Sequence, residues 1–336
     1  MSIIRQNPAT KEWVIIAAER AKRPHDFIRH DKVSEPPAWA GKCPFCPGNE
    51  ASTPPATLSL PPLTPEVHST WQVRAFPNRF PALSGEGSAE RQQENSLFRY
   101  MNGIGAHEVI VEHPQHNKHL ALMEIAEIEA ILDAYRERYL ELSSLPYVKF
   151  VLIFKNHGEG AGTSLEHPHS QIVATPVASS QVRQRYEIAT AYYDDIAHCL
   201  YRDIVEAELK TGTRIIWEDD RLVAFHPFAS QRPFETWIAP KSHCSSYGDI
   251  CDADITSLAK VLRRILKQRY RGLHNPDFNY IVHSAPAEDE HRPYYLWHLQ
   301  IMPRLTTVAG FEMGSGIYIN TALPEETAQF IRDVSV

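Results

Sequence analysis

The stretch Glu166-His167-Pro168-His169-Ser170-Gln171-Ile172 decides how the rest of the sequence is interpreted. An apolar, β-branched run at residues 147–154 precedes it and predicts a buried strand. A turn with three glycines follows at residues 156–162, and residues 170–174 predict a second strand. Because alternate side chains of an extended chain share one face, we expect His167, His169 and Gln171 to line one side of a sheet. A purely structural role is the ordinary alternative, since the chain holds 17 histidines and some must cluster by chance.

Composition indicates an ordinary globular protein with room for two domains or for one large duplicated domain. The chain has 336 residues, of which 43% are hydrophobic and 22% charged. Its formal net charge of -7 gives no basic footprint for nucleic acid, and no apolar run approaches the roughly 20 residues of a membrane helix. The first residues lack a signal-peptide pattern, so we expect a cytoplasmic protein with neither nucleic-acid nor membrane partners. Five cysteines, two of them in one Cys-x-x-Cys, favour reduced thiols or a metal site over a disulfide framework.

The order of predicted elements occurs twice, which indicates an internal duplication. In the first half a strand at 107–112, a helix over 120–142 and a strand at 147–154 lead to His169-x-Gln171. In the second half a strand near 235–239, a helix over 255–270 and a strand at 278–283 lead to His298-x-Gln300. We divide the chain into residues 1–178, which carry the chemistry, and residues 179–336, where Leu296 replaces the earlier histidine of the pair. Residues 181–209 are expected to be largely helical, and residues 34–66 and 84–96 to be loops.

A metal site is predicted around Cys43-Pro44-Phe45-Cys46. Zinc favours four sulfur or nitrogen ligands in tetrahedral geometry, and Cys43, Cys46, His116 and His167 make such a set. A redox pair or two unrelated surface thiols are the alternatives, although flanking prolines argue against a thioredoxin-like context. His116 could also be a surface histidine of a His-rich turn.

The candidate nucleophile is His169. A neutral imidazole attacks phosphorus well, and Pro168 stiffens the segment that presents it. Gln171 can donate an amide hydrogen to a phosphoryl oxygen, while the glycine turn and Ser164 offer further donors to phosphates. The sequence contains no P-loop lysine motif.

With these motifs, the sequence resembles the galactose-1-phosphate uridylyltransferase family, a branch of the histidine-triad superfamily. The resemblance covers nearly the whole chain, from the basic turn at residues 20–24 through Pro77-Asn78-Arg79-Phe80-Pro81 to Gly310-Phe311-Glu312-Met313-Gly314. It implies an α+β fold of two duplicated histidine-triad-like halves, with antiparallel sheets flanked by helices. It also implies transfer of UMP from UDP-glucose to galactose 1-phosphate, giving UDP-galactose and glucose 1-phosphate. The route is ping-pong, through a covalent uridylyl-histidine.

When the family's motifs are matched to this sequence, the resemblance implies roles for individual residues. His169 is the nucleophile, with Gln171 and Ser164 as catalytic partners, and Cys43, Cys46, His116 and His167 hold zinc. The nucleotide sugar and hexose 1-phosphate are expected to contact Arg20, Arg23, Asn78, Arg79, Phe80, Asn156, Gly162, Phe311 and Glu312. The basic turn and the late Phe-Glu segment reach toward the other subunit's active site in this family, so the resemblance implies a homodimer.

Several positions depart from the family pattern. Some members bind a second, iron-type ion, and here His283 and His298 match two of its ligands, whereas Gln300 stands in place of the last histidine. We therefore expect that second ion to be weakly bound or absent. Arg79 replaces an aspartate and Phe311 a tyrosine of other members, which bears on sugar and base choice. ADP-glucose phosphorylase, a dinucleoside polyphosphate phosphorylase and a zinc-stabilised nucleotide-binding protein without turnover are the alternatives.

Overall fold

In the computed structural model, residues 2–17, 24–28, 36–64 and 69–336 are described. Arg20 and Arg23, predicted to contact substrate, lie outside these residues. The centre of the fold is a ten-stranded sheet to which each half of the chain contributes five strands. From one edge to the other it comprises β3 (Leu58–Leu60), β4 (Val73–Pro77), β7 (Ala106–Val111), β9 (His169–Thr175), β8 (Phe150–His157), β13 (Phe278–His283), β14 (His298–Pro303), β12 (Thr236–Pro240), β11 (Leu222–Phe225) and β10 (Ile215–Glu218).

The two sets of five strands meet edge to edge at β8 and β13. These strands pair antiparallel, with Phe154 opposite Ile281 and Asn156 opposite Asn279. The order from the junction outward is the same on both sides, so β9 in one half corresponds to β14 in the other. The predicted α+β class with antiparallel strands is confirmed, and the two expected sheets are joined into one. The division at residue 178 stays a prediction.

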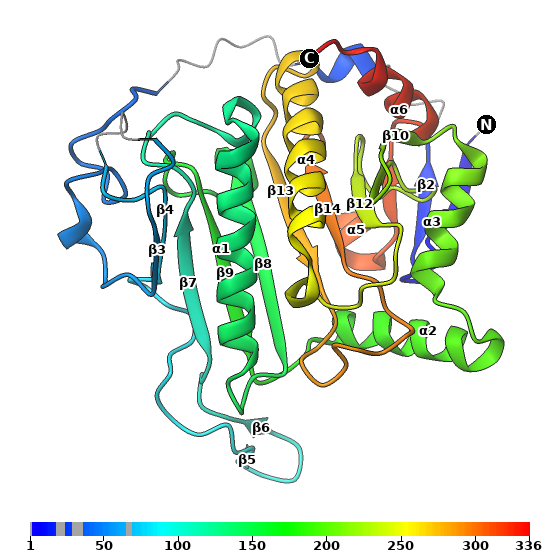
Figure 1. The fold of residues 1–336 in the computed structure, drawn as a ribbon. Coiled ribbons are helices and arrows are strands. Elements are labelled where there is room, and N and C mark those ends of the chain that lie inside the picture. The colour runs from blue at the N-terminus through cyan, green and yellow to red at the C-terminus, as the bar shows by residue number, and fades with distance from the viewer. Residues whose placement is uncertain (1, 18–23, 29–35, 65–68) are drawn as a thin grey trace.

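Two long helices cover one face of this sheet, α1 (Ile125–Ser143) over the first half and α4 (Asp252–Gly272) over the second (Figure 1). Helix α1 buries Ile128, Leu132 and Tyr135 against the strands, as its apolar spacing predicts. It begins five residues later than predicted, because residues 120–122 form a separate 3-10 turn (η4, Leu120–Leu122) and Glu124 caps the helix.

The prediction that residues 181–209 are largely helical is confirmed. The segment is not one continuous helix. It is divided into α2 (Ser180–Ile196) and α3 (Leu200–Thr211). Ala197 takes a left-handed conformation with φ 58° and ends α2, so the chain changes direction before α3 begins. Helix α3 packs on the sheet face opposite α4, where Tyr201 stacks on Trp237 and His298.

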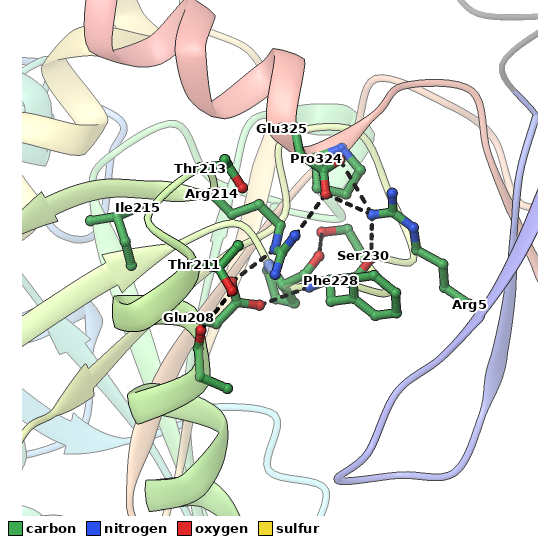
Figure 2. Close-up of polar contacts among 12 residues, drawn as sticks. Arg5, Glu208, Thr211, Thr213, Arg214, Ile215, Phe228, Ser230, Pro324 and Glu325 are labelled. Atoms are coloured by element: carbon green, nitrogen blue, oxygen red, sulfur yellow. Dashed lines mark hydrogen bonds and ion pairs between the residues drawn. The ribbon is translucent and has the colours of Figure 1, made fainter.

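A second, three-stranded sheet brings the two ends of the described chain together. It consists of β1 (Ile3–Gln6), β2 (Trp13–Ile16) and β15 (Tyr318–Asn320), with β15 parallel to β2. An ion cluster fixes this sheet to the rest of the molecule, as Figure 2 shows: Arg5 and Arg214 both contact Glu325, and Arg214 also contacts Glu208. Glu325 lies in α6 (Pro324–Asp333), so the cluster joins the first strand, α3 and the last helix.

The remaining elements are short. They are η2 (Pro24–Phe27), η3 (Glu50–Ser52), η5 (Glu159–Ala161), η6 (Tyr247–Asp249), α5 (Gly310–Ser315) and the hairpin of β5 (Gln92–Gln93) with β6 (Arg99–Tyr100). The hairpin begins within the stretch predicted as a loop at 84–96, and β3 and η3 lie within the one predicted at 34–66. In the described part of the chain, no helix combines the length and apolarity needed to cross a membrane.

Candidate functional site

Four buried side chains converge at one end of β9. The ligand atoms of Cys43, Cys46, His116 and His167 all lie within 4.8 Å of one another. Cys46 Sγ is 3.5 Å from His116 Nδ1 and 3.6 Å from His167 Nδ1, and Cys43 Sγ is 3.6 Å from the same atom of His167. Around a tetrahedral ion with metal–sulfur and metal–nitrogen bonds of zinc length, sulfur and nitrogen would be about 3.6 Å apart. The four residues could therefore hold one metal ion.

The surroundings of the cluster suit metal ligands. Backbone N–H groups of Phe45 and Ala40 donate to the sulfurs of Cys43 and Cys46. His167 Nε2 lies 2.7 Å from the His113 carbonyl oxygen, so this nitrogen carries the proton and Nδ1 faces the sulfurs. Burial lowers the pKa of His167 to about 3, which keeps the ring neutral.

The Cys46 thiol lacks the lowered pKa of a redox-active cysteine. Burial raises the pKa of Cys46 to about 11, and the neighbouring Cys43 adds to that shift. A redox-active cysteine instead has a lowered pKa, near a helix N-terminus or a cation. The alternative of two surface thiols is wrong, because Cys43 and Cys46 are 7% and 1% exposed.

His169, the first residue of β9, lies next to the cluster and is only 7% exposed. Its Nδ1 donates to the carbonyl oxygen of His167 at 2.8 Å, which leaves Nε2 with the lone pair. Burial lowers the pKa of His169, and the Lys155 ammonium lowers it further, so the ring is neutral near pH 7. The Phe45 ring packs 5.3 Å from it. His169 thus presents an unprotonated nitrogen from a fixed ring.

The predicted site residues Gln171 and Asn78 both contact His107, a residue that the sequence patterns did not single out. Gln171 Oε1 lies 2.7 Å from His107 Nε2, and Asn78 Nδ2 lies 3.2 Å from the same nitrogen. Asn78 follows β4, and its Oδ1 accepts from the Phe80 backbone. His107 belongs to β7, whose pairing with β9 sets Val109 opposite Gln171.

The other predicted contacts of the first half are placed around this face. Asn156, in β8, accepts a hydrogen bond from Asn279 of β13 at 2.7 Å. Gly162 has φ 86°, a conformation that favours glycine, and it ends η5. Ser164 is exposed in the loop that follows. Arg79 and Phe80 are exposed, Phe80 by 83%.

The last two predicted contacts, Phe311 and Glu312, lie on α5. Glu312 accepts from the Ala309 backbone as a cap, and Phe311 is 50% exposed. Helix α5 packs beside β15 in the second half, and Figure 1 shows it apart from β9. Within one chain these residues are therefore not brought to His169.

A buried polar network supports β9 from the helix-covered face. Lys155 Nζ donates to Glu112 Oε2 at 2.6 Å and to the His169 carbonyl oxygen at 3.1 Å. Ser170 and Tyr135 also bond to Glu112. Residue patterns did not predict this network, because strand alternation alone does not show which polar residues meet under a sheet.

The corresponding site of the second half is closed. His298 is 2% exposed, and its ring stacks on His283 with centroids 4.7 Å apart. Gln300 is bonded at both ends, through Oε1 to His283 and through Nε2 to Glu235. Arg185 donates to Nδ1 of His283 at 2.8 Å, and His283 is one of the two residues that match ligands of the second ion in other members. In the part of the chain that the structure describes, the one metal-ligand cluster found is that of the first half.

Comparison with known proteins identifies the family. The model described as "Galactose-1-phosphate uridyl transferase, N-terminal domain" matches residues 1–178, and a domain of unknown function (DUF4921) matches residues 109–334. The chain belongs to the galactose-1-phosphate uridyl transferase family. The family predicted from the sequence is confirmed.

Members of this family with different activities resemble the chain along its whole length. The ADP-glucose phosphorylase of Arabidopsis thaliana is 34% identical over 99% of this chain and 93% of its own. The galactose-1-phosphate uridylyltransferase of Thermotoga maritima is 29% identical over 100% of this chain and 99% of its own. Among solved structures, an Arabidopsis thaliana ADP-glucose phosphorylase with bound ADP-glucose superposes with a TM-score of 0.84 at 32% identity, covering 100% of this chain and 99% of that one. A uridylyltransferase superposes with a TM-score of 0.75 at 28% identity, covering 99% and 98%.

Proposed function

We propose that the protein transfers a nucleotidyl group from a nucleotide sugar to a phosphate acceptor through a covalent adduct on His169. The observation that carries the proposal is the 2.8 Å contact between His169 Nδ1 and the His167 carbonyl oxygen. A carbonyl oxygen only accepts, so Nδ1 carries the proton and Nε2 holds the lone pair. Nε2 attacks the α-phosphorus, and its new bond forms as the bond to the sugar-phosphate oxygen breaks. An oxygen of the acceptor phosphate then displaces the imidazole, which regenerates the neutral ring.

His169 is suited to both steps by its surroundings. Positive charge develops on the ring when Nε2 bonds to phosphorus, and the His167 carbonyl oxygen stabilises it at Nδ1–H. The sugar phosphate leaves as an anion and needs no proton. Gln171 donates an amide hydrogen to a non-bridging phosphoryl oxygen, where negative charge builds up.

We infer that ADP-glucose is the nucleotide sugar and orthophosphate the acceptor, with ADP and glucose 1-phosphate as products. This differs from the uridylyl transfer expected from the sequence. Two similarities support ADP-glucose as the substrate. The chain is 34% identical to an ADP-glucose phosphorylase over 99% of its length, and it superposes with a TM-score of 0.84 on such an enzyme with ADP-glucose bound.

Parallel assays test the substrate and the adduct. Purified protein is given ADP-glucose with phosphate, or UDP-glucose with galactose 1-phosphate, and product release is followed. We expect the first pair to react at least tenfold faster. Incubation with ADP-glucose labelled at the α-phosphorus should label the wild-type protein and leave His169→Asn unlabelled. A labelled His169→Asn variant would contradict the role of His169. A wild type labelled neither by this ADP-glucose nor by UDP-glucose labelled at the same phosphorus would favour a nucleotide-binding protein without turnover.

Uridylyl transfer to galactose 1-phosphate is the second candidate. Its support is the family model over residues 1–178 and the full-length similarity to the Thermotoga maritima enzyme. Faster reaction of the UDP-glucose pair in the same assay would establish it in place of the first.

We infer that the ion at Cys43, Cys46, His116 and His167 is zinc. Two sulfurs and two imidazole nitrogens, all buried, are a donor set that zinc prefers, and four protein ligands leave no open position. Zinc bound there would contribute folding energy and fix the start of β9. Metal analysis of the purified protein should give one zinc per chain.

We also infer a homodimer in which α5 of one copy serves the site of the other. Phe311 and Met313 are 50% and 74% exposed on this helix, away from His169 of the same chain. Mixing inactive His169→Asn and Phe311→Ala proteins after dissociation should restore part of the activity. A fully active protein whose mass in light-scattering measurements is that of a monomer would contradict this arrangement.

A further inference from the structure

His107 lies beside the catalytic strand and belongs to none of the roles described so far. Its ring is partly buried in β7 and faces the Gln171 side chain of β9. Two bonds hold the ring at opposite nitrogens, one from the Ala82 backbone and one to Gln171.

These bonds determine which nitrogen carries the proton. The Ala82 N–H points at Nδ1 from 3.2 Å, and an N–H can only donate, so Nδ1 is unprotonated. The proton of the ring is therefore on Nε2, which donates to Gln171 at 2.7 Å. Asn78 Nδ2 lies 3.2 Å from the same nitrogen, but an amide NH₂ only donates. Asn78 therefore cannot accept the Nε2 proton in place of Gln171.

The orientation of the Gln171 amide follows from the His107 tautomer. Since Nε2–H donates, the amide must turn its oxygen toward His107, and its NH₂ group toward the opposite side. A reversed amide would set two donors against each other and turn an oxygen toward the substrate.

The second half of the molecule contains the opposite arrangement. Trp237 pairs with Gln300 as Val109 pairs with Gln171, so Glu235 occupies the place of His107. Glu235 is an acceptor and takes the Gln300 amide hydrogen at 2.8 Å, while the oxygen of Gln300 faces His283. A hydrogen-bond donor at the position of His107 thus leaves the glutamine NH₂ group free to bind a substrate. An acceptor there, such as Glu235, binds the NH₂ group itself.

We propose that His107 is a positioning residue that fixes the Gln171 carboxamide with its N–H directed at the phosphoryl group transferred to His169. The inference rests on the proposed nucleotidyl transfer and holds for either base. Because the donor acts on charge that develops during transfer, its loss should reduce the rate of the chemical step more than substrate binding.

Three variants separate positioning from packing. In His107→Gln the new side chain can still donate to Gln171, whereas His107→Glu copies the second-half arrangement, which this fold already accommodates. The third variant, Gln171→Ala, removes the group that is positioned. Adduct formation on His169 is measured in single turnovers with labelled ADP-glucose and, separately, labelled UDP-glucose, together with the melting temperature.

We expect His107→Glu and Gln171→Ala each to slow adduct formation about 100-fold with substrate affinity within threefold, as for loss of one donor to a transition state. The double variant that combines His107→Glu with Gln171→Ala should form the adduct no more slowly than Gln171→Ala alone. His107→Gln should keep at least a tenth of the wild-type rate of adduct formation. If His107→Glu does not fold, His107→Asn, which reaches Ala82 but not Gln171, carries the same expectation.

The outcomes separate the two proposals. Normal labelling of the wild type and of His107→Glu would overturn the role of His107 alone, as would additive losses in the double variant. A wild-type protein labelled by neither nucleotide sugar would overturn the proposed function, and this inference with it.

Discussion

The two histidines at the start of β9 use opposite nitrogens, and this difference separates their roles. His167 bonds through Nε2 to the His113 carbonyl and turns Nδ1 to the sulfurs. His169 bonds through Nδ1 to the His167 carbonyl and leaves Nε2 unprotonated. One ring is therefore arranged as a ligand and the other as a nucleophile, although both have the same covalent structure and nearly the same place in the chain.

Replacing a single sulfur tests the ligand role. Cys43→Ser should lose most of the bound metal and several kcal/mol of unfolding free energy, since metal binding and folding are coupled. Metal analysis and thermal unfolding measure both quantities. Cys251→Ser is the matched control, because this exposed thiol lies outside the cluster. Equal metal content and melting temperature in the two variants would contradict a metal at Cys43.

At this scale the sequence predicts the ligand set but not its neighbours. The Cys-x-x-Cys spacing and the two histidines are sufficient to group the four ligands that the structure brings together. His107 could not be found in this way, because its role depends on the register between β7 and β9. Register follows from side-chain packing and from chain connections that residue types do not reveal.

The first turn of α1 contains a carboxylate on which the pH dependence of stability depends. Burial would raise the pKa of Glu127, but hydrogen bonds from His113, Lys118 and the Glu124 backbone outweigh it and lower the pKa to about 2. The unfolded chain has the ordinary value of 4.5. The bonds therefore stabilise the fold above pH 4.5, and this contribution falls as the pH drops toward 2.

Glu127→Gln should flatten this dependence. Between pH 5 and pH 3 the wild type should lose about 2 kcal/mol more unfolding free energy than the variant, measured by urea titration at each pH. Glu137→Gln, an exposed carboxylate of the same helix, is the control and should follow the wild type. The same slope in all three proteins would show that the bonds to Glu127 contribute no pH-dependent stability.

Element boundaries follow the sequence where a cap or turn is clear and depart from it elsewhere. Ser179 caps α2 by accepting from Val182, and a serine before an apolar-periodic run predicts such a start. The break at Ala197 has no comparable signal, because alanine is a strong helix former and seldom takes φ > 0. After this turn α3 packs on the second-half strands through Tyr201, a contact that residue preferences near Ala197 do not encode.

At the scale of the molecule, the repeated order of elements was predictable and the junction between the halves was not. The strands β8 and β13 are the inner edges of two similar sets, and each would expose unpaired backbone groups alone. Their pairing satisfies both edges and brings Asn156 to Asn279. Residue patterns give each strand its faces but not its edge partner, so one continuous sheet could not be distinguished from two.

The ion cluster in Figure 2 connects the first strand, α3 and α6, and its contribution can be measured at one residue. Glu208 is 4% exposed, and Arg214 Nε donates to it at 2.8 Å. Burial raises the pKa of Glu208, so the carboxylate depends on Arg214 to remain charged.

Arg214→Met should therefore cost about 3 kcal/mol of unfolding free energy, because a buried carboxylate loses its counterion. Arg202→Met removes an exposed partner of Glu206 and should cost less than about 1 kcal/mol. Adding Glu208→Gln to Arg214→Met should recover part of the loss, since a neutral amide needs no counterion. Chemical denaturation of the four proteins measures these differences, and similar losses for Arg214→Met and Arg202→Met would mean that the cluster adds no more than a surface ion pair.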